Sequence, residues 1–353
     1  MCRKVINVCH HLSSGCCMWS GIEDVYGTKT NQNVPEAFLF GLSSYGEATL
    51  LMMNDTKQPF LFSVADGRTK KIYDQIKEVL GLRYQISEGR TLSYALSSIK
   101  KEIDEGNPVI LGPLDMYHLP YLKMYHKMHI PMHYVLMVGY DERKDCVLIY
   151  DCDRIELIEL PKQELIKAWA IEKNVVGDNN GFIRFTLCEN PKELYQLAYI
   201  CLKKKAERQL REKPDFIGVN AYTKIAKELK KLESRYSKAE LKEILASLTE
   251  FFGTVPKLPN ALLGVSDEKD IHYHGNYDRL SAMLLELGKT YYRKDWIQAS
   301  ELFSKCGLYI EKITNCIIEL CLVDKDCMKE ISEYFVLIGE SAKRAYEIIR
   351  EEQ

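Results

Sequence analysis

The chain has 353 residues, 46% of them hydrophobic and 28% charged, which is enough for two domains of ordinary size with substantial cores. The formal net charge of -2 and the lack of a basic tract argue against a nucleic-acid partner. No apolar run is long enough to cross a bilayer and no signal peptide is recognisable, so we expect a cytoplasmic protein without a membrane partner. The twelve cysteines follow no repeating spacing, so we expect reduced thiols, no metal site and no cofactor.

The most informative stretch covers residues 11–27. Its apolar residues recur at spacings of three and four, which predicts a buried helix with Glu23 and Asp24 off the apolar face and with Gly27 as its stop. A nucleophile in the first turn of such a helix is activated by the partial positive charge of the helix end. The candidate nucleophiles at this position are Ser14, Cys16 and Cys17.

A second informative region is an expected antiparallel hairpin with strands at residues 133–140 and 146–150. Folding it about Arg143 places residues whose numbers add to about 286 opposite each other, so that Asp151 faces Val135 and lies one pleat from His133. His133 and Asp151 would then meet at the open end of the hairpin, as a base and its orienting carboxylate do.

The remaining periodicities complete an α+β fold. Beyond residue 190 the pattern is helical almost throughout, so we expect an antiparallel-sheet domain in residues 1–190 followed by an all-α helical bundle domain in residues 191–353. A long irregular connection at residues 253–276 is of a length that often lines a site. Helices are expected at 35–42, 70–80, 93–105, 161–170, 191–212, 221–235, 238–252, 278–293, 296–321 and 325–351, and further strands at 48–53, 60–64, 84–87, 109–112 and 182–187.

A nucleophile at a helix start, a histidine that opens a strand and an aspartate that ends the next strand form the pattern of papain-like cysteine enzymes. Further stretches stand out along the chain: His11 with the helix ending at Tyr26-Gly27, then 39–43, 114–121, 133–141 with Tyr150-Asp151, and 274–280. On these stretches residues 1–190 resemble the N-terminal domain of the butirosin biosynthesis protein H family, and the later residues resemble the helical domain often fused to it.

The resemblance implies a papain-like, peptidase C39-like fold for the first domain. The named member of the family moves an aminoacyl chain from an acyl carrier protein to an aminoglycoside amine, and only its reaction class carries over. We therefore expect an acyltransferase, as used in antibiotic and other secondary-metabolite biosynthesis, that passes an acyl or aminoacyl group from a thioester or amide to an amine through a covalent intermediate. The expected partners are a small-molecule or peptide substrate, with an acyl carrier protein and a homodimer as further candidates.

The nucleophile departs from the family pattern. Family members carry a cysteine thirteen residues before the closing glycine, and counting back from Gly27 gives Ser14. With Ser14 as the origin the buried offsets fall on apolar residues, whereas with Cys16 as the origin they would bury Glu23 and Asp24. Spacing therefore favours Ser14, but chemistry favours Cys16 or Cys17, because a thiol ionises far more readily than a hydroxyl.

Several further residues are candidates for substrate binding, each with a structural alternative such as packing of the core or a solvated loop. The substrate-binding candidates are His11, Asp115, Tyr117, Tyr121, His274 and Arg279.

Three functions stay open: acyl transfer, hydrolysis by a peptidase or amidase, and non-catalytic binding of a small molecule or peptide on the same scaffold.

Overall fold

The structure is a computed structural model that describes residues 3–13, 17–43, 47–53, 59–64, 69–174, 177–249 and 275–351. These residues form two compact units, one made of 3–39 and 69–197 and the other of 40–64, 198–249 and 275–351. The second unit thus takes in residues 40–64, which lie within the range that the sequence assigns to the first domain. The expected α+β class is confirmed, since an antiparallel sheet is followed along the chain by a helical region.

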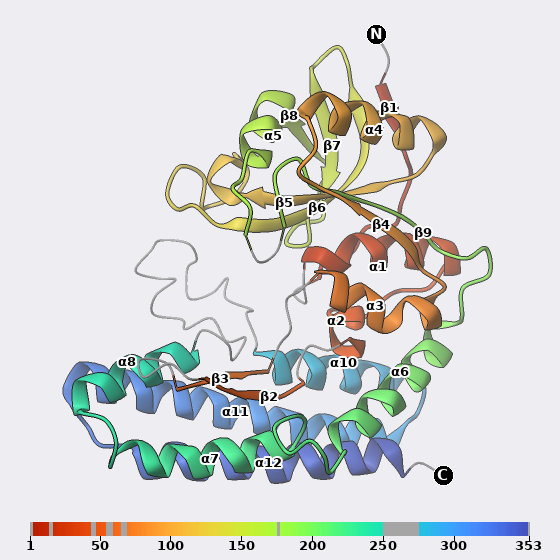
Figure 1. Cartoon of the computed structure of the whole chain (residues 1–353). Helices are drawn as coiled ribbons and strands as arrows, with labels where there is room; N and C mark the ends of the chain where they lie inside the picture. The colour runs from red at the N-terminus through yellow and green to blue at the C-terminus, as the bar shows by residue number, and fades with distance from the viewer. Residues whose placement is uncertain are drawn as a thin grey trace. The chain divides into compact units, whose positions relative to one another are not determined.

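The first unit is built on a seven-stranded antiparallel sheet, as counted within the described ranges (Figure 1). Its strand order is β4-β9-β5-β6-β7-β8, and β1 pairs with the second half of β6 on the edge that β5 leaves open. The central position of β6 follows from its residues, which are buried from Tyr134 to Asp141. The strands are β1 (Arg3–Val5), β4 (Arg83–Ser87), β5 (Val109–Asp115), β6 (Pro131–Asp141), β7 (Cys146–Tyr150), β8 (Ile158–Pro161) and β9 (Phe182–Thr186).

Helices cover both faces of this sheet (Figure 1). One face packs against α4 (Leu92–Glu105) and α5 (Lys162–Trp169), whose buried residues join those of β5, β6 and β7 in one hydrophobic core. The other face packs against α1 (Cys17–Thr30). Gly21 permits the close approach of this helix, since a Cβ at that position would lie 2.9 Å from Leu136 Cδ1. The unit also contains α3 (Thr69–Leu80) and the short 3-10 helix η1 (Met116–His118).

The end of α1 differs from the expectation. Gly27 does not stop the helix, which continues to Thr30 and is followed by Asn31 in the left-handed region at φ 54°. Gly27 instead permits a close approach of the returning chain, since a Cβ there would lie 3.1 Å from Val34 Cγ2. Glycines end α3 and α4 as expected, with Gly81 after α3 at φ 68° and Gly106 after α4 at φ 89°.

The expected hairpin register is confirmed at its open end, where Leu136 pairs with Tyr150. The register shifts between Met137 and Gly139, so that Gly139 pairs with Leu148 on the side of the turn. The register at the open end is the part that matters for the site, because Asp151 directly follows Tyr150, whose pairing with Leu136 sets the position of Asp151. Two short strands, β1 and β8, were not predicted.

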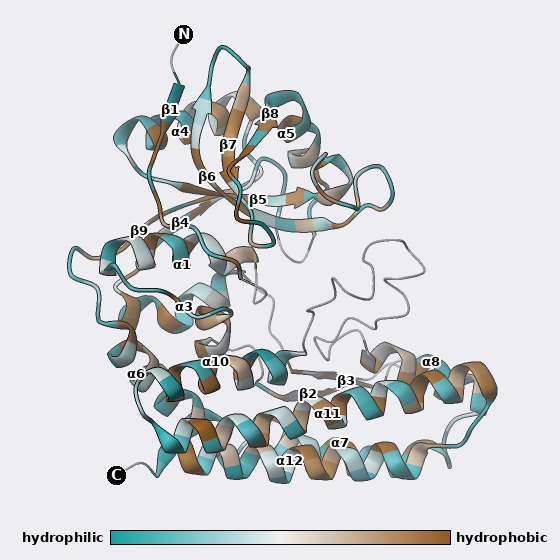
Figure 2. Ribbon diagram, turned by 180° about the vertical axis from the view of Figure 1, so that it is seen from behind, coloured by the Kyte–Doolittle hydropathy of each residue, from teal (hydrophilic) through white to brown (hydrophobic). Residues whose placement is uncertain are grey.

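The second unit combines a two-stranded hairpin with helices that pack around an aromatic core. The hairpin of β2 (Thr49–Met52) and β3 (Phe60–Ser63) contacts α7 and α8, and α11 contacts α8, α10 and α12. Hydrophobic stripes run along α7, α11 and α12 (Figure 2), as expected for helices that bury one face. The helices are α7 (Asn220–Leu232), α8 (Lys238–Thr249), α10 (Asn276–Thr290), α11 (Lys294–Val323) and α12 (Met328–Arg350).

Two of the passages of the chain between the units fall within α2 (Phe38–Leu42) and α6 (Leu194–Gln209). In the second unit Lys205 is fully buried and donates hydrogen bonds to the carbonyl oxygens of Gly41 at 2.8 Å and Ser43 at 3.0 Å. Burial lowers the pKa of Lys205 to about 7. Among the helices in the described ranges, none combines the length and apolar character that a membrane span requires.

The packing of β1 against β6 generates a stability prediction. A methyl group at Gly139 would overlap the carbonyl oxygen of Lys4 and lie 3.1 Å from Val5 Cα. We expect Gly139→Ala to lower the free energy of unfolding by about 1–3 kcal/mol, because β1 must move away. Urea denaturation measures the change. Deleting residues 1–5 removes the obstacle, so a second Gly139→Ala cost of equal size in the deleted chain would contradict the steric explanation.

Candidate active site

The structure brings His133 and Asp151 into direct contact at the open end of the β6–β7 hairpin. His133 Nε2 lies 2.7 Å from Asp151 Oδ2, and the aspartate side chain has no exposed surface while the histidine side chain is 11% exposed. Two further donors hold the carboxylate: the Tyr121 hydroxyl at 2.8 Å from Oδ2 and the Cys152 backbone N–H at 2.7 Å from Oδ1. Asp151 is therefore a buried carboxylate whose two oxygens both accept hydrogen bonds.

This contact fixes the tautomer of His133. An ionised carboxylate only accepts, so Nε2 must carry the hydrogen and the lone pair of the neutral imidazole lies on Nδ1. Burial by itself would lower the pKa of His133, but the negative charge of Asp151 outweighs it and raises this pKa above 6.5. Burial likewise acts to raise the pKa of Asp151, but His133, Tyr121 and the Cys152 N–H lower it overall.

The segment before α1 is joined to the turn that follows Asp151. The Ser13 backbone N–H donates to the Cys152 carbonyl oxygen at 2.9 Å, so Ser13 lies against the turn that follows the hairpin. Cys17 is the first residue of α1 and is half-buried. The other two candidate nucleophiles, Ser14 and Cys16, lie outside the described residues, between Ser13 and Cys17.

A buried ionic cluster, not predicted from the sequence, lies beside this segment and consists of His10, His11, Glu23 and Asp24. The Asp24 carboxylate accepts from His10 Nδ1 at 2.7 Å and from His11 Nδ1 at 2.8 Å. Glu23 Oε2 lies 3.2 Å from His11 Nε2 and accepts from the Ser13 hydroxyl at 3.0 Å, and Glu23 Oε1 accepts from the Leu39 backbone N–H at 2.6 Å.

The prediction that Glu23 and Asp24 lie off the buried face of α1 is wrong, since they are 0% and 1% exposed. The reason is that α1 is buried nearly all round and its acidic pair is matched by polar donors from residues 10–13. The burial pattern therefore does not distinguish Ser14 from Cys16 as the helix origin. The sequence signal for this cluster was a pair of adjacent histidines, His10 and His11, followed by a pair of adjacent acidic residues, Glu23 and Asp24, on a predicted helix.

The candidate substrate-binding residues of the first unit lie in different settings. His11 belongs to the ionic cluster, and Tyr121 holds Asp151. Asp115 shapes the loop after β5, since its carboxylate accepts from the backbone N–H groups of Tyr117 at 3.1 Å and Ile130 at 3.0 Å and from His129 Nδ1 at 2.6 Å. The Tyr117 ring stacks on His129 with centroids 4.0 Å apart. Asp115 and Tyr117 thus fold a loop that begins where β5 ends.

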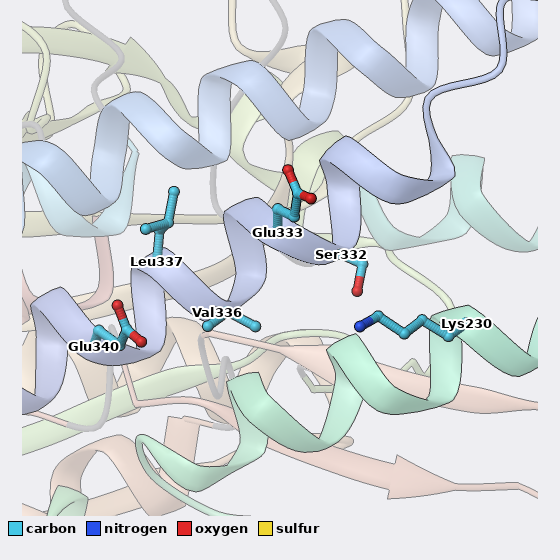
Figure 3. Close-up of a pocket in the computed structure, with 6 residues that line it drawn as sticks. All are labelled: Lys230, Ser332, Glu333, Val336, Leu337 and Glu340. Carbon is cyan, nitrogen blue, oxygen red and sulfur yellow. The ribbon is translucent and has the colours of Figure 1, made fainter.

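One further substrate-binding candidate, Arg279, belongs to the second unit. Arg279 lies on α10 with its guanidinium 5.2 Å from the centre of the Phe40 ring, and His274 lies outside the described residues. A surface pocket in this unit, between α7 and α12, contains none of the candidates (Figure 3). It is lined by Lys230, Ser332, Glu333, Val336, Leu337 and Glu340. Across the part of the chain that the structure describes, no three His, Cys, Asp or Glu side chains are arranged to hold a metal ion.

The pairing of His133 with Asp151 predicts a titration. In the wild type the imidazole of His133 should titrate above pH 6.5, because the carboxylate favours its charged form. In Asp151→Asn the burial remains and the charge is lost, so the midpoint should fall below 6.5. NMR titration of the histidine ring carbons measures both values. Equal midpoints in the two proteins would contradict the assigned ion pair.

The ionic cluster predicts how stability depends on pH. Burial acts to lower the pKa of His11, but Asp24 and Glu23 raise it to about 10 from 6.5. The folded state therefore binds a proton that the unfolded state releases between these values, so the contribution of His11 is complete below pH 6.5 and is lost as the pH rises through about 10.

We expect the urea midpoint to fall from pH 6 to pH 10, and to fall less steeply in His11→Asn. His126→Asn is the matched control, because His126 is exposed and its φ of 56° is one that asparagine adopts readily. A pH dependence that is unchanged in His11→Asn would contradict the charge assigned to this histidine.

Comparison with known proteins finds a family model that matches part of the chain. Residues 16–152 match the family model described as butirosin biosynthesis protein H, N-terminal. No curated protein matches the chain. The matched segment contains Cys16, Cys17, His133 and Asp151, whereas Ser14 and the ionic-cluster histidines precede it. The resemblance inferred from the sequence is thus confirmed for residues 16–152, which are similar to the N-terminal domain of the butirosin biosynthesis protein H family.

Proposed function

We propose that this chain is a papain-like acyl-transfer enzyme in which His133 is the general base and Asp151 orients it. The observation that carries the proposal is the 2.7 Å contact between His133 Nε2 and a fully buried carboxylate, which leaves the basic Nδ1 for a reacting group. The link from Ser13 to Cys152 supports a nucleophile at the start of α1, because it holds the preceding segment against the same turn. The candidates remain Ser14, Cys16 and Cys17.

In the first step the nucleophile, a thiol or a hydroxyl, attacks the carbonyl carbon of a thioester or amide donor. His133 Nδ1 takes the proton of the nucleophile as the new bond forms, and returns it to the departing thiol or amine when the bond to the leaving group breaks. The product is an acyl-enzyme. In the second step an amine attacks the acyl-enzyme, His133 takes the amine proton and returns it to the nucleophile, and an amide leaves.

The surroundings of the pair suit this role. Tyr121 donates to Asp151, and Arg154 in turn holds Tyr121 by donating from its guanidinium to the Tyr121 carbonyl oxygen at 3.1 Å and by lying 4.7 Å from the centre of its ring. The carboxylate therefore stays ionised out of contact with water, and it stabilises the imidazolium that forms in each step. Asp151 is a positioning residue in this scheme, since it acts through His133.

Labelling by an acyl thioester tests the proposal. We expect a thioester of N-acetylcysteamine to acylate one residue among Ser14, Cys16 and Cys17, detected by mass spectrometry of the tryptic peptide 5–29. Replacing that residue by alanine should abolish the adduct, and His133→Gln should slow its formation by about 100-fold or more, because general-base catalysis contributes about 10²–10⁴-fold.

The same peptide contains a control, Cys9, whose thiol is exposed and whose labelling should not depend on His133. Cys9→Ala therefore separates reaction at the site from general thiol reactivity. Equal labelling rates in the wild type and His133→Gln, or an adduct on Cys9 alone, would overturn the proposal. Release of the acyl group to added amines rather than to water distinguishes transfer from the hydrolysis expected of a peptidase or amidase.

A further inference from the structure

The side chain of His10 lies between α1 and the turn after β7, and both of its ring nitrogens are engaged. Nδ1 lies 2.7 Å from Asp24 Oδ2 on α1. Nε2 lies 2.8 Å from the Arg154 carbonyl oxygen and 3.1 Å from the Asp151 carbonyl oxygen. The ring is 4% exposed and stacks on Tyr150 with centroids 4.4 Å apart. His10 therefore bridges the helix and the residue that orients His133.

The partners of His10 decide its protonation. A carboxylate and two carbonyl oxygens can only accept hydrogen bonds, so both ring nitrogens have to donate, and a neutral imidazole has one N–H. A neutral ring would turn a lone pair toward an oxygen in a water-poor site, which is costly. The geometry therefore requires an imidazolium, because in either neutral tautomer one ring nitrogen would have no hydrogen to donate.

The charged and titratable groups around His10 are consistent with this state. Asp24 faces it from α1, the neighbouring His11 opposes its charge from the same segment, and Tyr150 faces it from β7. The Arg154 guanidinium is paired with Asp153 at 2.9 Å and lies over Tyr121. Burial acts to lower the pKa of His10, but the hydrogen bond and charge of Asp24 outweigh it, so that this pKa is raised above 6.5.

We propose that His10 is a positioning residue which, as an imidazolium, fastens the Asp151 turn to α1 and thereby fixes the His133–Asp151 pair relative to the helix. The inference rests on the acyl transfer proposed above. A second link, from the Ser13 N–H to the Cys152 carbonyl oxygen, joins the same two elements, but it is a neutral hydrogen bond. The His10 link is charge-assisted and is correspondingly the stronger of the two.

The protonation state is measurable in the wild-type protein without reference to activity. Long-range nitrogen–proton NMR at pH 7.5 should show His10 with both nitrogens protonated, at a pH where an ordinary histidine is mostly neutral. The resonance is assigned through contacts of its ring protons with Tyr150, on which it stacks. A spectrum with one unprotonated His10 nitrogen at this pH overturns the inference, even if every His10 variant fails to fold.

The positioning role is tested in His10→Gln, whose amide cannot donate from both of its ends. We expect the midpoint of His133 to fall relative to the wild type, because the Asp151 carboxylate is held less firmly against it. Labelling by the N-acetylcysteamine thioester should slow by about 10- to 100-fold, as small misplacements of reacting groups do. A folded His10→Gln protein with the wild-type His133 midpoint overturns the positioning role. If the wild type is not labelled at all, the acyl-transfer proposal fails, while both NMR measurements still decide the role of His10.

Discussion

The first unit depends on one buried carboxylate. Asp151 has no exposed side-chain surface, so its charge is tolerated only because the His133 ring, the Tyr121 hydroxyl and the Cys152 N–H all donate to it. These donors come from three segments of the chain, β6, the loop after β5 and the turn itself. Removing one of them would leave a charged acceptor partly unpaired, which typically costs a few kcal/mol. The same contacts that stabilise the fold therefore hold the imidazole in one tautomer.

The turn that carries Asp151 also joins the sheet to α1. The Asp151 side chain faces His133, while the carbonyl oxygens of Asp151, Cys152 and Arg154 accept from His10 and Ser13. On the helix side Glu23 and Asp24 are buried with two histidines, so that as imidazoliums the two cations balance the two anions. Buried pairs of this kind add little net stability, but they strongly disfavour arrangements in which a partner is missing. The cluster therefore specifies how α1 meets the hairpin.

The sequence predicts those parts of the site that depend on interactions between residues close together along the chain. Two apolar segments and the charged turn between them set the expected hairpin register, which was enough to bring His133 and Asp151 together. Glycines at positions 81 and 106 end their helices because they adopt positive φ. The prediction that Gly27 ends the helix is wrong because the role of this glycine is a tertiary contact with residues 32–34, which no local pattern reveals.

The burial of Glu23 and Asp24 was misread for a related reason. An acidic side chain on a helix normally indicates solvent, and only the histidines of a separate segment reverse that expectation. The nucleophile could not be chosen either, since a helix buried nearly all round carries no register information. The hairpin of β2 and β3 was predicted as strands, but its place in the second unit depends on contacts with α7 and α8, which are distant in sequence.

In the proposed mechanism His133 Nδ1 serves a nucleophile at the start of α1. A crystal structure of the protein after acylation by a thioester measures this most directly, because the modified atom is then visible. We expect an acylated oxygen or sulfur on Ser14, Cys16 or Cys17 within about 3–4 Å of His133 Nδ1, which is hydrogen-bond reach with some looseness. An acyl group on a residue remote from His133, or a His133 ring whose Nδ1 faces the interior away from the adduct, would contradict it.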